Sequence, residues 1–448
     1  MSYRERLAVV SPIKPSSAAD MDFYSPAYQQ LKKNLHQILL ERIDLERLQQ
    51  LSVDQFKREL SHLVEHIVDQ EKIIVNQAER RQLVIDMQHE MLGFGPIEPL
   101  LTDPTISDIL VNGCNQIYVE RRGKLELTPI VFNDNDHLLK VIEKIVSRVG
   151  RRIDESSPMV DARLPDGSRV NAIIPPLSID GPTLSIRRFS VKPLTMADLL
   201  QYKSLTPPIA TLLDSLAKAK VNILISGGTG SGKTTLLNVL SGFIPPDERI
   251  VTIEDAAELQ LQQPHVVRLE TRPPNIEGKG EIPQRALVKN ALRMRPDRII
   301  LGEVRGGEAL DMLQAMNTGH EGSLATIHAN TPRDALSRLE NMVGMANANL
   351  SARAVRQQIA SAITVVIQIM RFTDGTRKLI SLQEVTGMEG DTVTMQEIFQ
   401  YRRSGVNAEG KVLGQFCATG IYPQFDQRLK EFGVPVPDAI YDPSRVFE

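Results

Sequence analysis

Apolar residues recur at helical spacing in the first part of the chain, after an aperiodic start. One amphipathic stripe begins at Leu31, a second runs from Phe56 to Val68, and a third helix is predicted over residues 78–92. Residues 1–27 contain several prolines and serines without periodicity, which predicts a flexible tail. The pattern therefore predicts a small helical bundle over residues 28–92 that packs on itself.

Short strands and helices are mixed between Gly93-Phe94-Gly95-Pro96, which ends the helical run, and about residue 190. The predicted elements are strands at 106–112, 116–120 and 184–189, a helix at 137–149, and a hairpin around Asp166-Gly167-Ser168. This mixture is typical of an α+β domain, assigned to residues 93–190. Pro193 and the polar segment after it predict a linker over residues 191–205.

Strand and helix patterns alternate from about Pro207 to Met345, as expected for a parallel sheet covered on both faces. Strand-like runs then follow at 364–370, 378–386 and 393–399. The segment after about Asn407 is rich in Gly and Pro and is expected to pack irregularly on the sheet. Residues 206–448 are therefore predicted to form one α/β domain.

Composition narrows the class of protein. The 448 residues carry a formal net charge of −3, so no global basic field is available to hold nucleic acid. Aromatic residues are 4% and Trp is absent, which disfavours a base-stacking surface. The only two cysteines, Cys114 and Cys417, lie far apart, and no apolar run approaches the length of a membrane helix. We expect a cytoplasmic protein that reaches a membrane through a partner.

The stretch from Gly227 to Thr235 fits the phosphate-binding loop pattern G-x4-G-K-[ST], between a predicted buried strand and a predicted helix. Its glycines allow backbone N–H groups to turn toward phosphate oxygens. Lys233 is expected to reach the β- and γ-phosphates of ATP, and the Thr234 hydroxyl to ligate Mg²⁺. The remaining predicted nucleotide-binding residues are Gly228, Thr229, Gly230, Ser231, Gly232 and Thr235.

Two later apolar strands end in carboxylates. Glu254 and Asp255 end the first, where they either face the nucleotide or cap the next helix. The second ends at Gly302-Glu303, with Gly302 in place of the Asp usual in this motif of phosphate-loop NTPases. Glu303 is expected to orient and deprotonate the attacking water, the alternative being a solvated strand end.

A histidine and arginine pattern accompanies these acids. Thr326 and His328 alternate onto one side of a strand, which suggests a sensor of the γ-phosphate, although buried structural histidines remain an alternative. His320 and His328 have no apparent third zinc ligand. Arginines crowd the end of the 93–190 domain; they form either a solvated basic face or a set of groups that reach the γ-phosphate from another domain or subunit. They are Arg148, Arg151, Arg152, Arg163, Arg169, Arg187 and Arg188.

Four motifs in order resemble the traffic ATPases of type II and type IV secretion and of type IV pili. They are the phosphate loop, the Asp box at 252–259, the strand Leu301-Gly302-Glu303-Val304-Arg305 and the His box at 318–330. The segments at 94–101, 107–113 and 159–171 look like the CpaF/TadA branch, which drives tight-adherence (Flp-type) pili. The four-cysteine zinc insert of many relatives is absent, in keeping with that branch.

The resemblance implies a RecA-like phosphate-loop NTPase core with a PAS-like α+β domain and an N-terminal helical bundle. It also implies a homo-hexameric ATP hydrolase at the cytoplasmic face of the inner membrane, which acts on a pilus or secretion platform protein. Glu303 and Glu254 would share water activation and the magnesium shell, and His328 would read the γ-phosphate. Arg163 and Arg169 would be the γ-phosphate arginines, with Arg187 as a further candidate.

Two other functions stay open on the sequence. The first is a conjugation-type ATPase that translocates DNA or protein, which the acidic balance and few aromatics disfavour for DNA. The second is a scaffold that binds ATP with negligible hydrolysis. No specific nucleic-acid partner is expected.

Overall fold

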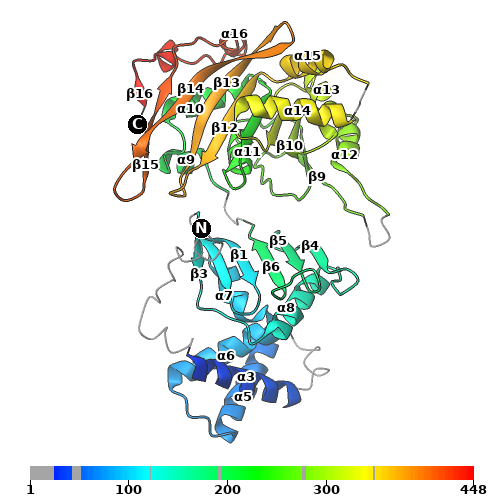
Figure 1. The fold of residues 1–448 in the computed structure, drawn as a ribbon, viewed down its shortest axis with the longest axis vertical. Coiled ribbons are helices and arrows are strands. Elements are labelled where there is room, and N and C mark those ends of the chain that lie inside the picture. Colours follow the sequence, from blue (N-terminus) through cyan, green and yellow to red (C-terminus); the bar gives the residue numbers. More distant parts are fainter. Residues whose placement is uncertain are drawn as a thin grey trace. The chain divides into compact units, whose positions relative to one another are not determined.

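The computed structural model describes residues 25–42, 52–121, 123–189, 193–274, 279–346 and 349–447. Contacts divide the chain into two compact units, residues 1–190 and 191–448, which are described separately (Figure 1). The predicted flexible tail lies almost entirely outside the described residues, although Pro26 and Ala27 already belong to the first helix.

Three helices open the first unit: α3 (Pro26–Arg42), α5 (Val53–Gln70) and α6 (Gln77–Leu92). Helices α5 and α6 each begin with a capping box. The side chains of Ser52 and Asn76 accept the backbone N–H of the residue three positions later, and the side chain of that residue accepts the backbone N–H of Ser52 or Asn76. Leu35, Leu60 and Leu83, one from each helix, are fully buried in a shared core. The two predicted amphipathic stripes and the predicted third helix therefore pack together as a small bundle.

An antiparallel sheet forms the rest of this unit. Its strand order is β3-β2-β1-β6-β5-β4, and α8 (Asn135–Arg148) buries Leu138, Ile142 and Ile145. The strands are β1 (Ile106–Asn112), β2 (Ile117–Arg121), β3 (Lys124–Leu127), β4 (Met159–Arg163), β5 (Arg169–Ile173) and β6 (Thr183–Arg187). The short η1 (Gly95–Ile97) and α7 (Glu98–Thr102) connect α6 to β1. This is an α+β arrangement.

The second unit is built on a ten-stranded sheet of order β16-β15-β14-β13-β12-β7-β11-β10-β8-β9. Strands from β12 to β9 in that order run parallel, and those from β13 to β16 extend the sheet as antiparallel neighbours. The strands are β7 (Ile223–Gly227), β8 (Ile250–Glu254), β9 (Val266–Glu270), β10 (Arg298–Val304), β11 (Leu324–Ile327), β12 (Val365–Arg371), β13 (Arg377–Glu389), β14 (Thr392–Val406), β15 (Val412–Ala418) and β16 (Val446–Phe447).

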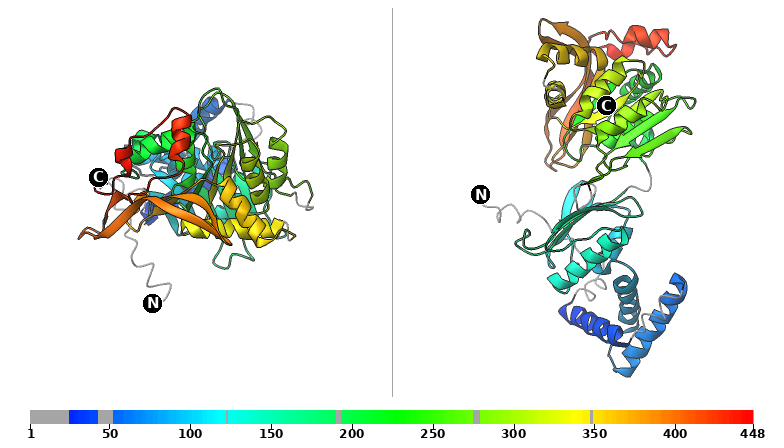
Figure 2. Two further views of the ribbon diagram at one scale, coloured as in Figure 1. Left: turned by 90° about the horizontal axis from the view of Figure 1, so that it is seen from above. Right: turned by 90° about the vertical axis from the view of Figure 1, so that its right-hand side faces the viewer.

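Helices cover both faces of the parallel part (Figures 1 and 2). One apolar core takes in α10 (Pro207–Lys218), α11 (Lys233–Ser241) and residues such as Ile223 and Ile225 of β7. The other takes in Leu224 of β7 with α12 (Gln284–Ala291), α13 (Glu308–Asn317), α14 (Pro332–Ala346) and α15 (Ala352–Ala362). Alternate residues of β7 thus face opposite cores. The predicted α/β class with a RecA-like core is confirmed.

Two expectations for this unit need correction. The segment predicted as a linker contains α9 (Met196–Gln201), which begins with a capping box at Thr195, and Leu199 and Leu205 lie in the core. The segment after Asn407 is not irregular, because it forms β15, α16 (Asp426–Glu431), η2 (Asp438–Tyr441) and β16. Buried Glu384 of β13 accepts the backbone N–H groups of Gln424 and Phe425, which ties this segment to the sheet.

Candidate nucleotide-binding and catalytic site

The phosphate loop joins the buried strand β7 to the N-terminus of α11. Gly230 and Gly232 have φ of +67° and +100°, which side chains disfavour. A Cβ on Gly227 would lie 2.5 Å from the carbonyl oxygen of Ile369 on the neighbouring strand β12. The glycines of the motif are therefore required both by backbone conformation and by the close approach of β12.

The loop residues suit a polyphosphate. Helix α11 starts at Lys233 with Gly232 as N-cap, and no side chain caps its first turn. Its N–H groups can therefore bind phosphate oxygens. Gly228, Thr229 and Gly230 are exposed, and Ser231 donates its hydroxyl to the Gly228 carbonyl.

Lys233 is mostly buried and folds back onto the loop. Its Nζ donates to the carbonyl oxygen of Gly228 at 2.8 Å and lies 3.3 Å from Nε2 of His328. Thr234 and Thr235 follow on the first turn of α11 and are half-buried. A hydroxyl at this position, with carboxylates at the same edge of the sheet, is an oxygen donor set that suits Mg²⁺.

The Glu303 carboxylate on β10 contacts the side chains of Arg305 and His328. One carboxylate oxygen lies 2.7 Å from Arg305, and the other lies 3.2 Å from Nε2 of His328. Arg305 also contacts Asp255 at 3.2 Å. Burial acts to raise the pKa of Glu303, but the hydrogen bond and charge of Arg305, aided by His328 and Lys233, bring it below its usual value. The carboxylate is therefore ionised at neutral pH.

His328 is neutral at physiological pH in this arrangement. Burial lowers the pKa of its imidazole, the nearby charge of Lys233 lowers it further, and Glu303 opposes both effects. A neutral imidazole accepts a hydrogen bond at one nitrogen and donates one from the other. His328 therefore stands between the lysine of the phosphate loop and the carboxylate of Glu303.

Glu254 has a different environment, although sequence patterns paired it with Glu303. It is 3% exposed, and its Oε2 accepts the N–H groups of Glu258 and Leu259 at 2.7 and 2.9 Å. Its other oxygen has no hydrogen-bond partner among the residues that the structure describes. Burial raises the pKa to about 7, against the effect of the two N–H bonds. Glu254 caps the turn after β8 rather than a helix.

Gly302 is explained by Glu254. A Cβ at position 302 would lie 2.8 Å from Cγ of Glu254. The space that the usual strand-end Asp would need on β10 is thus occupied by a carboxylate side chain from β8. The Gly302 carbonyl also accepts the hydroxyl of Thr326 at 2.5 Å, which joins the His box strand to β10.

The remaining His-box residues have structural contacts. The chain after His328 is held by Gln368 of β12, whose amide donates to the carbonyls of Ala329 and Asn330. Among the described residues, no group of three or more His, Cys, Asp or Glu side chains could hold a metal ion by itself, so zinc at His320 finds no support.

In the first unit, three of the predicted arginines form a row across adjacent strands. Arg163 of β4 pairs directly with Arg169 of β5, and Arg169 pairs with Arg187 of β6. Asp108 contacts Arg187 at 3.1 Å. The row concentrates positive charge at one place on this sheet.

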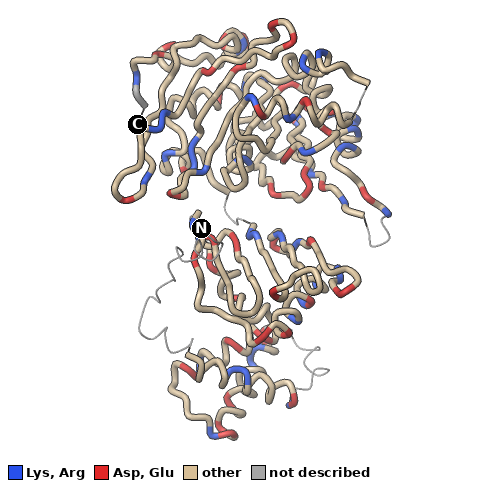
Figure 3. The backbone as a smooth tube through the Cα atoms, viewed as in Figure 1, with Lys and Arg blue, Asp and Glu red and all other residues tan. Residues whose placement is uncertain are grey.

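Other members of the arginine cluster are used in packing. Arg148 donates to the carbonyl of Leu92 and lies over the ring of Phe94, and Arg188 donates to the carbonyls of Asp103 and Ile106. Elsewhere both signs of charge are interspersed along each unit (Figure 3). The cluster is therefore not a uniform basic face.

Sequence patterns missed Arg371 and Arg377, which flank the turn between β12 and β13. Arg377 Nε donates to the carbonyl oxygen of Gly230 at 2.8 Å, and Arg371 also lies beside that glycine. Both are about 140 residues away along the chain. Only the pairing of β12 with β7 brings them to the loop, so no local signal indicated them.

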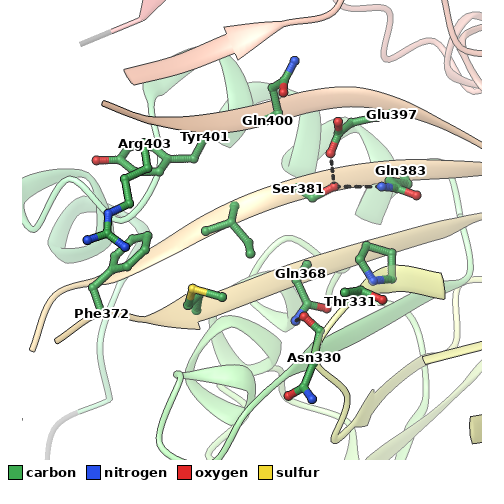
Figure 4. Close-up of a pocket in the computed structure, with 13 residues that line it drawn as sticks. Asn330, Thr331, Gln368, Phe372, Ser381, Gln383, Glu397, Gln400, Tyr401 and Arg403 are labelled. Carbon is green, nitrogen blue, oxygen red and sulfur yellow. Dashed lines mark hydrogen bonds between the residues drawn. The ribbon is translucent and has the colours of Figure 1, made fainter. Parts of the chain in front are cut away.

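A hollow of about 510 Å³ lies on the face of β12, β13 and β14 (Figure 4). Its floor includes Ser381, which donates to Glu397 and accepts from Gln383. Phe372, Tyr401 and Arg403 lie at one end. No residue of the phosphate loop lines it, so it is separate from the nucleotide site.

Comparison with known proteins agrees with the motifs. Residues 90–415 match the family model described as Type II/IV secretion system protein. A putative conjugal transfer protein of Mycobacterium tuberculosis is 38% identical over 310 residues, which are 68% of this chain and 88% of the relative. The conjugal transfer protein TrbB of Rhizobium radiobacter is 34% identical over 65% of this chain and 86% of its own length.

Solved structures with similarity include the VirB11 ATPase of the Brucella suis type IV secretion system, in complex with sulphate. It is 30% identical, with a TM-score of 0.35, over 64% of this chain and 94% of that one. In the part of the chain that the structure describes, no helix combines the length and the apolar character needed to cross a bilayer. From its phosphate loop, its acidic strand ends and a family match over most of its length, the chain belongs to the Type II/IV secretion system protein family.

Proposed function

We propose that this protein is an ATP hydrolase that powers a secretion, conjugation or pilus machine. The observation that carries the proposal is the chain of contacts from Lys233, whose Nζ lies 3.4 Å from Nδ1 of His328, through the imidazole to Glu303, which lies 3.2 Å from Nε2. It joins the phosphate loop to an ionised carboxylate at the carboxyl end of a parallel strand. A nucleotide-binding scaffold without hydrolysis has no need of such a connection.

In this proposal the loop from Gly228 to Thr235 holds ATP and the Thr234 hydroxyl ligates Mg²⁺. The bound cation neutralises charge on the phosphates. Glu303 orients the attacking water and accepts its proton at a carboxylate oxygen. Arg305 and His328 hold that carboxylate in place. His328 also senses the γ-phosphate, because a phosphate group that binds Lys233 competes with the His328 ring for the lysine ammonium.

Glu254 has a supporting role in this scheme. Its pKa of about 7 leaves only part of it ionised at neutral pH, whereas Glu303 is ionised, and its Oε2 already accepts two backbone N–H groups. Its unpartnered oxygen can accept a hydrogen bond from a water of the magnesium shell. We therefore propose Glu303 as the base and Glu254 as a positioning group, a division of roles that sequence patterns left open.

The arginine row supplies the remaining charge. We propose that Arg163 and Arg169, with Arg187 as a further candidate, reach the γ-phosphate of a nucleotide when units of one chain or of neighbouring chains close around it. The support is their position as direct cross-strand partners in one row on adjacent strands. A homo-hexamer in the cytoplasm, contacting a membrane platform protein, provides the setting for such closure.

The experiment that tests hydrolysis compares steady-state ATP turnover of the wild type and Glu303→Gln. We expect turnover to fall by about 10²–10⁴ because the general base is lost. Glu389→Gln, an exposed carboxylate at the end of β13, is the matched control and should keep wild-type turnover. Equal, near-zero turnover in the wild type and Glu303→Gln refutes the motor and favours the scaffold.

The arginine assignment is tested by Arg163→Ala and Arg169→Ala. Nucleotide binding should stay close to wild type while turnover falls by about 10³. Arg151→Ala, an exposed neighbour outside the row, is the control. Lost binding with unchanged turnover per bound nucleotide contradicts the assignment.

For the cargo, two candidates have separate support. The names of the relatives favour conjugation-type translocation, and the motifs at 94–101 and 159–171 favour assembly of a tight-adherence pilus. The interspersed charges and net charge of −3 argue against direct DNA binding.

ATPase stimulation by DNA that collapses between low and moderate salt would support a DNA pump. Capture of a pilus platform protein from membranes, lost on deletion of residues 1–92, would support pilus assembly.

A further inference from the structure

The β12–β13 turn places two arginines beside the phosphate loop. β12 runs parallel to β7 with Ile369 opposite Gly227, the last residue of β7. Two residues further along β12, Arg371 therefore passes the loop that follows Gly227. Arg377 begins β13 directly opposite Arg371. The pairing of these strands positions both cations next to the phosphate loop of the same chain.

Both arginines approach glycines of the loop closely. Nη1 of Arg371 lies 3.1 Å from the point that a Cβ on Gly230 would occupy, and Arg377 Nε donates to the Gly230 carbonyl. Cδ of Arg377 lies 3.5 Å from the corresponding point on Gly232, the N-cap of α11. A Cβ at position 230 would press on the Arg371 guanidinium, whereas a Cβ at position 232 would meet Arg377 at an ordinary van der Waals distance. Arg377 holds the Gly230 carbonyl oxygen, a group with no use in binding phosphate.

The turn between β12 and β13 fixes the place of both arginines. Arg371 and Arg377 are direct cross-strand partners. The neighbouring Lys378 is engaged elsewhere, since its Nζ donates to the Lys203 carbonyl and lies near the rings of Tyr401 and Phe416. The turn is held in shape, because Asp374 accepts from Thr376 and from the Val412 N–H of β15. A fixed turn that keeps cations together beside a phosphate loop is suited to binding an anion.

We propose that Arg371 is a direct ligand of the phosphate chain of the bound nucleoside diphosphate or triphosphate, and that Arg377 is a positioning residue that keeps the loop open for it. The inference rests on the proposed nucleotide site and adds a cis cation that the motifs do not contain. In this proposal Lys233 and Arg371 contact the same phosphate chain. Product ADP is therefore held by residues of two separate strand ends.

The test measures binding of Mg²⁺–ADP to the full chain by isothermal titration calorimetry. Arg371→Gln should weaken ADP binding by about tenfold through loss of a charge-assisted hydrogen bond. It should also reduce the dependence of the affinity on salt, because one ionic contact is gone. Arg371→Lys, which keeps the charge, should recover part of the affinity. Arg377→Gln should weaken ADP binding without changing the salt dependence.

Controls separate this inference from the proposed function. Arg402→Gln removes an exposed arginine from β14 and should bind ADP like the wild type. Lys233→Ala should lose ADP binding. If Arg371→Gln binds ADP within twofold of wild type while Lys233→Ala does not bind, the Arg371 assignment is overturned and the nucleotide site stands. If Lys233→Ala binds like the wild type, the nucleotide site itself is overturned, and Arg371 with it.

Discussion

Gly302→Ala is the most direct test of how β8 and β10 fit together. The new Cβ would lie 2.8 Å from Cγ and 3.4 Å from Oε2 of Glu254, where carbon atoms prefer about 3.5–4.0 Å. Glu254 cannot swing aside, because it is buried and its Oε2 accepts two backbone N–H groups. Overpacking of this kind costs about 1–3 kcal/mol. The Asp usual at this position would be worse tolerated than Ala.

The assay is a double-mutant cycle of Gly302→Ala with Glu254→Ala, in which the unfolding free energy of each variant is measured with urea. Far-UV circular dichroism is the signal, since the chain has no Trp. Removing the Glu254 side chain should relieve the collision, so the two changes should couple by about 1–2 kcal/mol. Hydrogen exchange along β8 and β10 reports the same effect locally, which matters in a chain of two units.

Gly344→Ala is the control, because a Cβ at that position on α14 meets nothing within 4 Å. It should be neutral or stabilise the helix by up to about 1 kcal/mol. A cost below about 0.5 kcal/mol for Gly302→Ala, or the same cost with and without Glu254, refutes the argument that Glu254 requires a glycine.

Two further predictions concern buried charge in the second unit. Glu254 has a folded pKa of about 7 against an ordinary 4.5, so the folded state binds more protons between these pH values, and stability should fall by about 3 kcal/mol as pH rises through this window. Glu254→Gln should flatten that pH dependence in urea unfolding from pH 4.5 to 8; an unchanged slope contradicts the raised pKa. Arg298 is fully buried and makes a bidentate contact with Glu248, so Glu248→Ala should cost about 3–5 kcal/mol in unfolding free energy by leaving that guanidinium unpaired. Glu340→Ala, which removes the partner of the more exposed Arg356, should cost less than about 1 kcal/mol, and equal costs would contradict the role of burial.

Local patterns were sufficient where a local rule governs structure. The three N-terminal helices, the phosphate loop between strand and helix, and the strands ending at Glu254 and Glu303 are all set by residues within a few positions of one another. The segments misjudged are those whose folding depends on distant contacts. Leu199 of the supposed linker is buried only because the core of the second unit receives it, and the segment after Asn407 is ordered by Glu384 of β13.

The sequence by itself determined the class of fold and the family. Glycine spacing, strand-end acids and hydrophobic period are read along the chain, and they need no partner from elsewhere to be recognised. Tertiary structure decided the chemical state of the site. Burial separates Glu254 from Glu303, a side chain from β8 explains Gly302, and the pairing of β12 with β7 brings Arg371 to the loop. These depend on dielectric, close packing and strand order, which arise only when distant segments meet.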